Sequence, residues 1–300
     1  MSSEQKTPLV SAIIATYNMG QYLPGAIKSV LNQKIQDLEL IIVDDGSTDN
    51  TGEVVKPFLS DPRVRYIYQP NSGQTKAKNA GLKASRGAYI GYCDADDEWH
   101  PDKLSLQIPL LEQDPNTAVV YGRICPMDQA GAYLYTETAS EYSGYITQQL
   151  FLENFIPFGS ALIRRSAIEE VGGFDENRRM GIDWDLWLRL SIKHRFECLR
   201  TVIYFYRVWE GQMSNNWRGR YESAFSIMRD FEARHPGVIA GSTRRKAYAL
   251  SYANRGQIRA KMDNDRMGCV LDALKAMRYG VCLSSSVRTL VKAFVRFPYR

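Results

Sequence analysis

Short apolar runs alternate with amphipathic stretches along the first 125 residues of this 300-residue chain. The apolar runs predict strands at residues 9–15, 38–43, 63–69, 88–93 and 118–124. The stretches between them have helical spacing and cover residues 22–33, 51–59, 75–84 and 103–113. Strands that alternate with helices of this length predict an α/β fold whose mixed, mainly parallel sheet is covered on both faces.

The pattern becomes less regular after residue 159, where strands and helices no longer alternate evenly. The segments predicted there are a strand at 161–164, a glycine turn at 172–173, a helix at 183–193 and strands at 196–199 and 202–208. Beyond Asn215 the pattern is helical, and a turn at Asp263-Asn264-Asp265 predicts a helical hairpin of residues 246–261 and 266–279. We therefore expect a domain over residues 1–214, with halves at 1–125 and 126–214, followed by a helical extension at 215–300.

Polar residues follow three of the predicted strands at the point where each strand ends. Thr16 and Tyr17 end the first strand, Asp44 and Asp45 the second, and Asp94 the fourth. Ligands of parallel sheets bind at the carboxyl ends of the strands, and a carboxylate there can accept hydrogen bonds from a ribose hydroxyl or a base N–H. The chain lacks the GxGxxG and GxxxxGK[ST] patterns, so neither a dinucleotide fold of the usual kind nor a P-loop is indicated.

Three carboxylates lie within four residues after the fourth strand, at Asp94, Asp96 and Asp97. Like charges this close shift each other's pKa, and a divalent cation between them relieves the repulsion. Oxygen ligands suit Mg²⁺ or Mn²⁺. The alternative is a strand that runs into a solvated, Asp-rich turn.

A glycine-containing loop at residues 71–75 enters a helix that carries Lys76, Lys78 and Asn79. Helix N-termini and lysines attract phosphates, so Lys76 and Asn79 are candidate nucleotide contacts. A solvated basic helix face explains any one of these lysines equally well.

These segments together resemble the family 2 glycosyltransferases, which have the glycosyltransferase A fold. The resemblance covers about the first 210 residues, and its motifs occur in order. They are VSAIIATYN at 10–18, IIVDDGSTD at 41–49, NSGQTKAKNAGLKASRG at 71–87, IGYCDADDEWHPDKL at 90–104, and GGFDE followed by DWDLWLRL within 172–190. The resemblance implies that residues 1–125 bind a nucleotide and that residues 126–214 bind an acceptor.

The resemblance also implies roles for single residues. Thr16, Tyr17 and Asp45 match the nucleotide-binding positions of the family, with Asp44 as a neighbour. Asp94 and Asp96 look like the DxD pair that holds a divalent metal, Mn²⁺ or Mg²⁺, on the diphosphate. Asp97 is a further candidate for this role.

Asp183 resembles the catalytic base of the family, with Asp185 as the second candidate. A carboxylate next to Trp184 and Trp187 in a partly apolar cleft has a raised pKa, as a general base needs. In this mechanism Asp183 takes the proton of the acceptor hydroxyl and the anomeric configuration inverts. The alternative is an Asp that only caps the helix.

The chain departs from the family after its last predicted strand. Some relatives carry a His in a YR-x-H pattern that approaches the metal or the diphosphate, and here Trp209 stands at or near that position. The metal then depends on the carboxylates and phosphate oxygens, or metal dependence is weak. Arg207 is a candidate phosphate contact, with a structural salt bridge as the alternative.

Charge is distributed unevenly along the chain. Residues 215–300 hold 17 lysines and arginines against 6 acidic residues, a net charge of +11, whereas residues 1–214 have a net charge of −6. Within residues 284–300 an apolar stripe and three aligned basic residues predict an amphipathic helix that binds an anionic membrane surface. Packing of that stripe on the body of the protein is the alternative.

Composition limits the cellular setting that we expect. Five scattered cysteines without metal-ligand spacing indicate reduced thiols, and no apolar signal segment or run of ~18 apolar residues is found. We therefore expect a cytoplasmic protein, peripheral on the cytoplasmic face of the inner membrane, without nucleic-acid partners.

The expected function is transfer of a sugar from a nucleotide-diphospho-sugar, most simply a UDP-sugar, to a hydroxyl of a glycan or lipid-linked glycan in surface-polysaccharide synthesis. Two alternatives remain open. One is a metal-dependent nucleotidyltransferase, which releases pyrophosphate. The other is an inactive, membrane-associated, glycan-binding scaffold.

Overall fold

The computed structural model of the chain describes residues 7–134 and 140–280. The chain divides into two compact units. Unit 1 comprises residues 1–146 and 155–210, and unit 2 comprises residues 147–154 and 211–300. The amphipathic helix predicted at 284–300 lies outside the described residues, and the predicted domain boundaries remain predictions.

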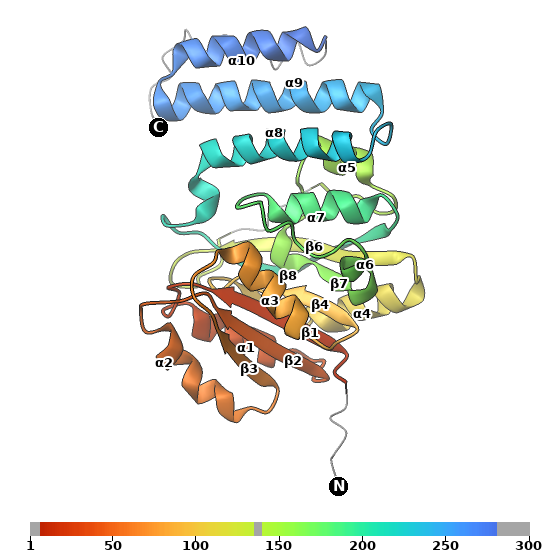
Figure 1. Cartoon of the computed structure of the whole chain (residues 1–300). Helices are drawn as coiled ribbons and strands as arrows, with labels where there is room; N and C mark the ends of the chain where they lie inside the picture. The colour runs from red at the N-terminus through yellow and green to blue at the C-terminus, as the bar shows by residue number, and fades with distance from the viewer. Residues whose placement is uncertain (1–6, 135–139, 281–300) are drawn as a thin grey trace. The chain divides into compact units, whose positions relative to one another are not determined.

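Unit 1 is an eight-stranded sheet with helices on its faces (Figure 1). Its strands are β1 (Val10–Thr16), β2 (Leu38–Asp44), β3 (Val64–Tyr68), β4 (Tyr89–Tyr92), β5 (Glu98–Trp99), β6 (Thr117–Met127), β7 (Leu162–Arg164) and β8 (Arg195–Arg207). Its α-helices are α1 (Leu23–Leu31), α2 (Thr51–Val55), α3 (Gln74–Ala84), α4 (Lys103–Gln113), α6 (Arg165–Glu170) and α7 (Ile182–Ser191). The α/β elements predicted for the first 125 residues are all present, with ends that differ by a few residues.

The strand order is β3-β2-β1-β4-β7-β6-β8-β5. The pairs β1–β2, β1–β4, β2–β3 and β6–β8 are parallel, whereas β7 is antiparallel to both of its neighbours and β5 is antiparallel to β8. The sheet is therefore mixed and mainly parallel, as predicted.

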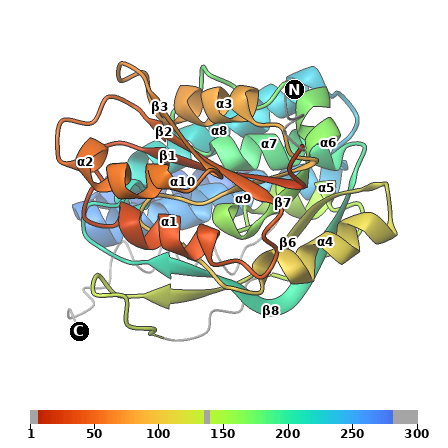
Figure 2. The same cartoon turned by 90° about the horizontal axis from the view of Figure 1, so that it is seen from below.

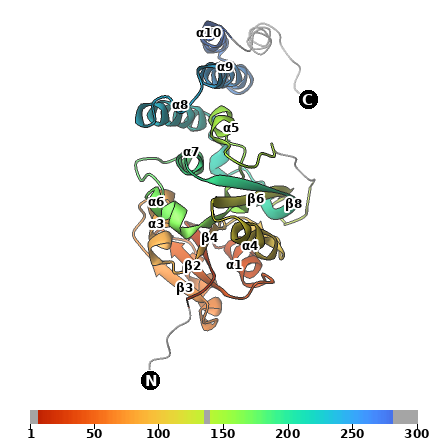
Figure 3. The same cartoon turned by 90° about the vertical axis from the view of Figure 1, so that its right-hand side faces the viewer.

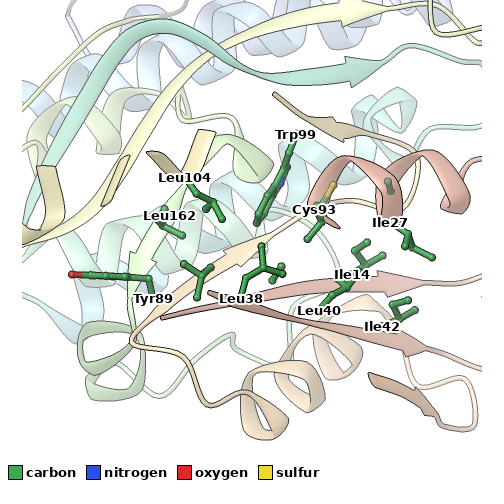
Figure 4. Packing of buried hydrophobic residues seen from close by; sticks show 14 of the residues in the cluster. Ile14, Ile27, Leu38, Leu40, Ile42, Tyr89, Cys93, Trp99, Leu104 and Leu162 are labelled. Carbon is green, nitrogen blue, oxygen red and sulfur yellow. The ribbon is translucent and has the colours of Figure 1, made fainter. Parts of the chain in front are cut away.

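Alternate residues of the buried strands pack on opposite faces of the sheet. In β2, Leu38, Leu40 and Ile42 join a core cluster with residues of α1 and α4, whereas Ile41 and Val43 pack with Ala77 of α3. Figure 2 shows α1 and α4 on one face of the strands and α3 on the other. The larger cluster is seen in Figure 4, where Leu40 and Ile42 lie beside side chains of β1 and α1. Full burial of each such side chain contributes about 1.5–3 kcal/mol.

The two strands predicted at 196–199 and 202–208 form one strand, β8, so that prediction is wrong in this detail. The exposed residues Arg200 and Thr201 interrupt the apolar pattern, which explains the predicted break. The ladder with β6 continues across them through register shifts near Gly122 and Arg123. Such irregularities let a strand bend without ending its pairing.

Unit 2 is helical in its described part. Its α-helices are α5 (Thr147–Leu152), α8 (Trp217–Arg234), α9 (Gly241–Ile258) and α10 (Arg266–Arg278), and α9 lies between α8 and α10 (Figure 3). The predicted hairpin is confirmed, since Asn264 turns the chain at φ +53° and Asp265 caps α10 by accepting from Gly268 N. No helix within the described residues is long and apolar enough to cross a membrane.

Candidate active site

The carboxyl ends of β1, β2 and β4 lie next to one another in the sheet of unit 1. β1 pairs with β2 on one side and with β4 on the other, and Thr16 is in register with Asp44. Asp45 directly follows β2, and Asp94 comes two residues after β4. The topology thus brings together the polar strand ends that the sequence predicted as a site.

The β2 turn, residues 44–50, has carboxylates that are bonded within the fold. Asp44 is buried, and its oxygens accept from the Tyr66 hydroxyl at 2.6 Å and from Ser47 N at 2.8 Å. Asp45 is also buried and accepts from Ser72 N at 2.9 Å and from Gly73 N at 2.7 Å. Asp45 therefore also holds the loop that leads into α3, whereas Asp44 fixes its own turn against β3.

A second network joins the end of β1 to the β2 turn. Asn18 adopts φ +53°, donates its N–H to Ser47 Oγ at 2.9 Å and accepts from Thr48 N at 2.8 Å. Asp49 accepts from Gly20 N at 3.0 Å and from the Thr51 hydroxyl. Desolvation acts to raise the pKa of Asp49, but these hydrogen bonds outweigh it and lower the pKa.

The first predicted nucleotide contacts, Thr16 and Tyr17, differ in exposure. Thr16 is buried, and its Oγ1 has no hydrogen-bond partner among the residues that the structure describes. Tyr17 is 45% exposed at the same strand end. A buried hydroxyl without a partner is rare in a folded protein, so Thr16 is a polar group that a ligand at this edge can satisfy.

The β4 turn, residues 94–97, holds the three clustered carboxylates. The Asp94 side chain is 38% exposed, and its Oδ1 accepts from Lys78 Nζ at 2.7 Å. Lys78 is buried, and its ammonium lies 4.1 Å from the centre of the Phe158 ring. The ring and the carboxylate together hold this cation at the site.

Asp96 has a different partner. Its Oδ2 accepts from the indole N–H of Trp209 at 2.8 Å. Burial, followed by the charge of Asp94, raises the pKa of Asp96, although the indole bond lowers it. The fold therefore holds two like charges close together at this turn.

Asp97 is turned toward the interior. It is buried, and it accepts from the Tyr204 hydroxyl and from Arg207 N, both at 2.7 Å. Burial and then the charges of Asp96 and Asp94 raise the pKa of Asp97. Gly159 makes room for the Tyr204 ring, since a Cβ there would lie 2.1 Å from it. These contacts favour a structural role for Asp97 over a share in the metal site.

Arg207 is buried and binds protein atoms with its whole guanidinium group. Nε donates to the Asp96 carbonyl at 2.7 Å, Nη1 to the carbonyls of Asp128 and Gln129, and Nη2 to Glu98 Oε1 at 3.0 Å. These contacts match the second role considered for Arg207, a structural salt bridge. A phosphate contact of Arg207 stays a prediction.

The predicted bases lie at the start of α7. Gly181 precedes the helix in the left-handed region at φ +67°, a conformation that glycine adopts readily, and Asp183 lies partly buried in the first turn. Asp185 is buried and accepts from Arg178 Nε at 2.9 Å and from Arg189 Nε at 2.8 Å. Two arginines thus bind Asp185, which favours Asp183 as the base.

The helical period of α3 separates residues that the sequence grouped together. Lys78 is buried with Thr75 and Gly81 at i, i+3 and i+6, whereas Lys76 is exposed. Asn79 bonds the turn after α6, with its amide N–H donating to the Phe174 carbonyl and its oxygen accepting from Phe174 N. Lys78, which bonds Asp94, was thus not chosen as a candidate from the sequence, although its position on the buried side of the helix was a usable signal.

The donor set fits a divalent cation only if the substrate completes the coordination. Among residues 7–134 and 140–280, no group of three or more His, Cys, Asp or Glu side chains is arranged to hold a metal. Asp94 and Asp96 supply carboxylates whose mutual repulsion a cation relieves. Mg²⁺-type sites commonly use one or two carboxylates together with substrate phosphates, so this pair fits such a cation.

Comparisons with known proteins agree on one family. The sequence profile of the family described as glycosyl transferase family 2 matches residues 11–172. Hyaluronan synthase of Pasteurella multocida is 34% identical over 205 residues, which are 66% of this chain and 20% of that protein. An uncharacterized glycosyltransferase of Rickettsia typhi is 30% identical over 252 residues, 81% of this chain and 79% of that protein. The chain spans only about a fifth of the length of the synthase.

Two solved structures have the same fold. Residues 1–349 of S. aureus TarS in complex with UDP-GlcNAc superpose with a TM-score of 0.69 at 16% identity, covering 95% of this chain and 89% of that chain. The mannosyltransferase PcManGT from Pyrobaculum calidifontis, in complex with GDP-Man and Mn²⁺, has a TM-score of 0.57 at 17% identity, covering 96% and 86%. At these identities the similarity concerns the fold alone.

Proposed function

The chain belongs to glycosyltransferase family 2, and we propose that it transfers a sugar from a UDP-sugar to a hydroxyl group of a glycan, with inversion at the anomeric carbon. The predicted family and the glycosyltransferase A fold with a helical C-terminal region are confirmed. The observation that carries the proposal is the β4 turn, which holds Asp94 and Asp96. β4 pairs with one edge of β1, and β2 pairs with the other edge. This turn lies within the residues that match the family.

The proposed donor is a nucleotide-diphospho-sugar. Support comes from the fold shared with TarS bound to UDP-GlcNAc and with PcManGT bound to GDP-Man. The Thr16 hydroxyl, which has no hydrogen-bond partner among the described residues, and the exposed Tyr17 ring lie at the end of β1, where a nucleotide is expected. UDP is our specific proposal for the nucleotide.

Asp94 and Asp96 are the residues that would hold a divalent cation, Mn²⁺ or Mg²⁺. Such a cation supplies Lewis-acid neutralisation of the nucleoside diphosphate as it leaves. Lys78 adds a fixed positive charge beside Asp94, because the Phe158 ring and the carboxylate keep its ammonium in place. We propose that Lys78 helps to bind the diphosphate.

Asp183 is the proposed base. Its carboxylate accepts the proton of the acceptor hydroxyl while that oxygen forms the new bond to the anomeric carbon and the bond to the diphosphate breaks. Its place in the first turn of α7 after Gly181, and the occupation of Asp185 by two arginines, support this assignment. A positioned base typically contributes 10²–10⁴-fold to the rate.

The acceptor is proposed to be a growing surface glycan or lipid-linked glycan. Relatives named hyaluronan synthase and chondroitin synthase support a polysaccharide acceptor. Peripheral attachment through residues 284–300, and a cytoplasmic location, remain proposals from the sequence.

The test is product formation with a panel of UDP-, GDP- and dTDP-sugars in Mn²⁺ and in EDTA. We expect release of nucleoside diphosphate, fastest with a UDP-sugar and with Mn²⁺. Release of pyrophosphate instead identifies a nucleotidyltransferase, and donor binding without turnover identifies a binding scaffold.

Asp183→Asn tests the base. We expect kcat to fall about 10²–10⁴-fold with unchanged UDP affinity, because the substitution removes only the proton acceptor. Asp102→Asn is the matched control, since Asp102 is a surface carboxylate bonded to Lys34. Near-normal turnover of Asp183→Asn excludes Asp183 as the base.

A further inference from the structure

The last residues of β8 and those just after it hold the β4 turn from one side. Tyr204 and Arg207 bind Asp97 and the Asp96 carbonyl, and Trp209, two residues beyond the strand, reaches the Asp96 carboxylate itself. Trp209 thereby contacts the carboxylate of a proposed metal ligand.

The indole of Trp209 is held by packing as well as by its hydrogen bond. Its ring lies 5.6 Å from the Tyr22 ring at an interplanar angle of 52°. The Arg207 guanidinium also lies against the Tyr22 ring, 5.0 Å from its centre. Arg207 is bonded to Asp96, Glu98 and the 128–129 carbonyls, so the ring against which the indole packs is itself held in place.

The two carboxylates of the proposed metal pair therefore have chemically different partners. Asp94 is bonded to a cation, Lys78 Nζ, at 2.7 Å, and Asp96 to a neutral N–H at 2.8 Å. An indole N–H is a donor only, so it can neither take a proton from the carboxylate nor bind a metal. It orients one oxygen of Asp96 and leaves the negative charge of the group in place.

We propose that Trp209 is a positioning residue, whose indole N–H orients the Asp96 carboxylate to bind the divalent cation of the nucleotide-sugar complex. The inference rests on the proposed function, because it gives Asp96 the role of a metal ligand. Trp209 acts through Asp96 and contacts neither substrate nor metal in this scheme. In this scheme a well-oriented Asp96 carboxylate takes the place of an additional protein ligand to the cation.

The experiment measures the Mn²⁺ affinity of the full chain in the presence of UDP. The EPR signal of free Mn²⁺ reports how much of the metal is not bound. The variants are Trp209→Phe, which keeps an aromatic ring against Tyr22 but removes the N–H, and Asp96→Asn. Trp217→Phe is the matched control, because Trp217 lies in unit 2 and packs on Arg218. UDP affinity in EDTA is measured alongside, since the indole bond does not affect nucleotide binding without metal.

We expect Trp209→Phe to bind Mn²⁺ about 10-fold more weakly than the unmodified chain, as is typical when a partner of a metal ligand is removed. UDP affinity in EDTA stays unchanged, and Trp217→Phe behaves like the unmodified chain. The inference is overturned if Trp209→Phe binds Mn²⁺ normally while Asp96→Asn does not. If the unmodified chain binds no more Mn²⁺ than Asp96→Asn, the metal role in the proposed function fails instead.

A second variant covers the case in which Trp209→Phe does not fold. Trp209→Gln keeps a side-chain N–H donor at the same position without adding an imidazole ligand, and we expect its Mn²⁺ affinity to stay close to that of the unmodified chain. Binding that is about 10-fold weaker in a folded Trp209→Gln variant contradicts orientation by an N–H donor.

Discussion

Two acidic turns flank the end of β1 at the carboxyl edge of the sheet, and their carboxylates have different surroundings. In the β2 turn, Asp44 and Asp45 are buried and accept from hydroxyl, amide and backbone donors, and hydrogen bonds lower the pKa of Asp49. In the β4 turn, burial and mutual repulsion raise the pKa of Asp96 and Asp97. The fold satisfies the first turn by itself, whereas we propose that a cation relieves the repulsion in the second.

The comparison separates two uses of the same residue type. A carboxylate surrounded by fixed donors stabilises a loop, because its charge is balanced before any ligand arrives. Two carboxylates held close together carry a free-energy cost in the protein alone, and a ligand of opposite charge removes that cost. Three predictions follow from this difference, in order of expected effect.

The largest effect is expected for Asp96→Asn in the β4 turn. Turnover should fall on the order of 10³-fold, because Lewis-acid stabilisation of a leaving group contributes several kcal/mol. The free energy of unfolding should not fall, since Asn keeps an acceptor for the Trp209 N–H and removes a repulsive charge. Product formation and urea unfolding measure the two quantities. A variant that stays active but loses stability would place Asp96 in the same class as the β2 carboxylates.

Asp45→Ala in the β2 turn should act mainly on stability. The backbone N–H groups of Ser72 and Gly73 lose a charged acceptor, and a hydrogen bond to a charged group contributes about 1.5–3 kcal/mol. We expect urea unfolding to show a loss of about 3 kcal/mol. Asp102→Ala is the control, since its ion pair with Lys34 is at the surface and contributes about 0–1 kcal/mol. Equal losses in both variants would contradict a structural role for Asp45.

The smallest effect concerns the pH dependence of stability, where the two turns should have opposite signs. The lowered pKa of Asp49 means that its contribution is present above the unfolded pKa of about 3.9 and is lost as the pH falls through the folded pKa. The raised pKa of Asp96 means that its ionisation costs stability as the pH rises from about 3.9 through its folded pKa.

Urea unfolding of the metal-free chain across this pH range measures both contributions. Asp49→Asn should reduce the loss of stability at low pH, and Asp96→Asn should remove a loss that appears as the pH rises. In the presence of Mn²⁺ and UDP, the contribution of ionised Asp96 to stability should change sign, whereas that of Asp49 should not. If Asp49→Asn and Asp96→Asn changed the pH dependence of stability in the same direction, the two turns would not differ electrostatically.

Much of the fold could be predicted because its signals are local. Apolar periodicity located the strands and helices of the first 125 residues, and the turn at Asn264 located the hairpin of unit 2. The break predicted in β8 was wrong because the irregular ladder with β6 is a contact distant in sequence. Ordered motifs predicted the family, which the comparisons confirm.

The candidate site could be predicted only in part. From the sequence, Asp97 was a further candidate beside the Asp94 and Asp96 pair, and the structure turns Asp97 inward to Tyr204 and Arg207. Lys76 was preferred to Lys78, although Lys78 makes the ion pair with Asp94. The role of Trp209 could not be read, because its partner Asp96 is 113 residues earlier in the chain.

The sequence by itself determined the order of elements, the family and the placement of acidic residues at strand ends, since these depend on local spacing and motif order. Only the tertiary structure decided which carboxylates are bonded to fixed donors of the protein and which are held close to one another. The hydrogen-bond donors to these carboxylates come from residues 69–73, 78 and 204–209. Strand pairing and helix packing set the distance between each donor and its Asp. Charge and hydrogen bonding act over a few ångströms in space, whatever the separation along the chain.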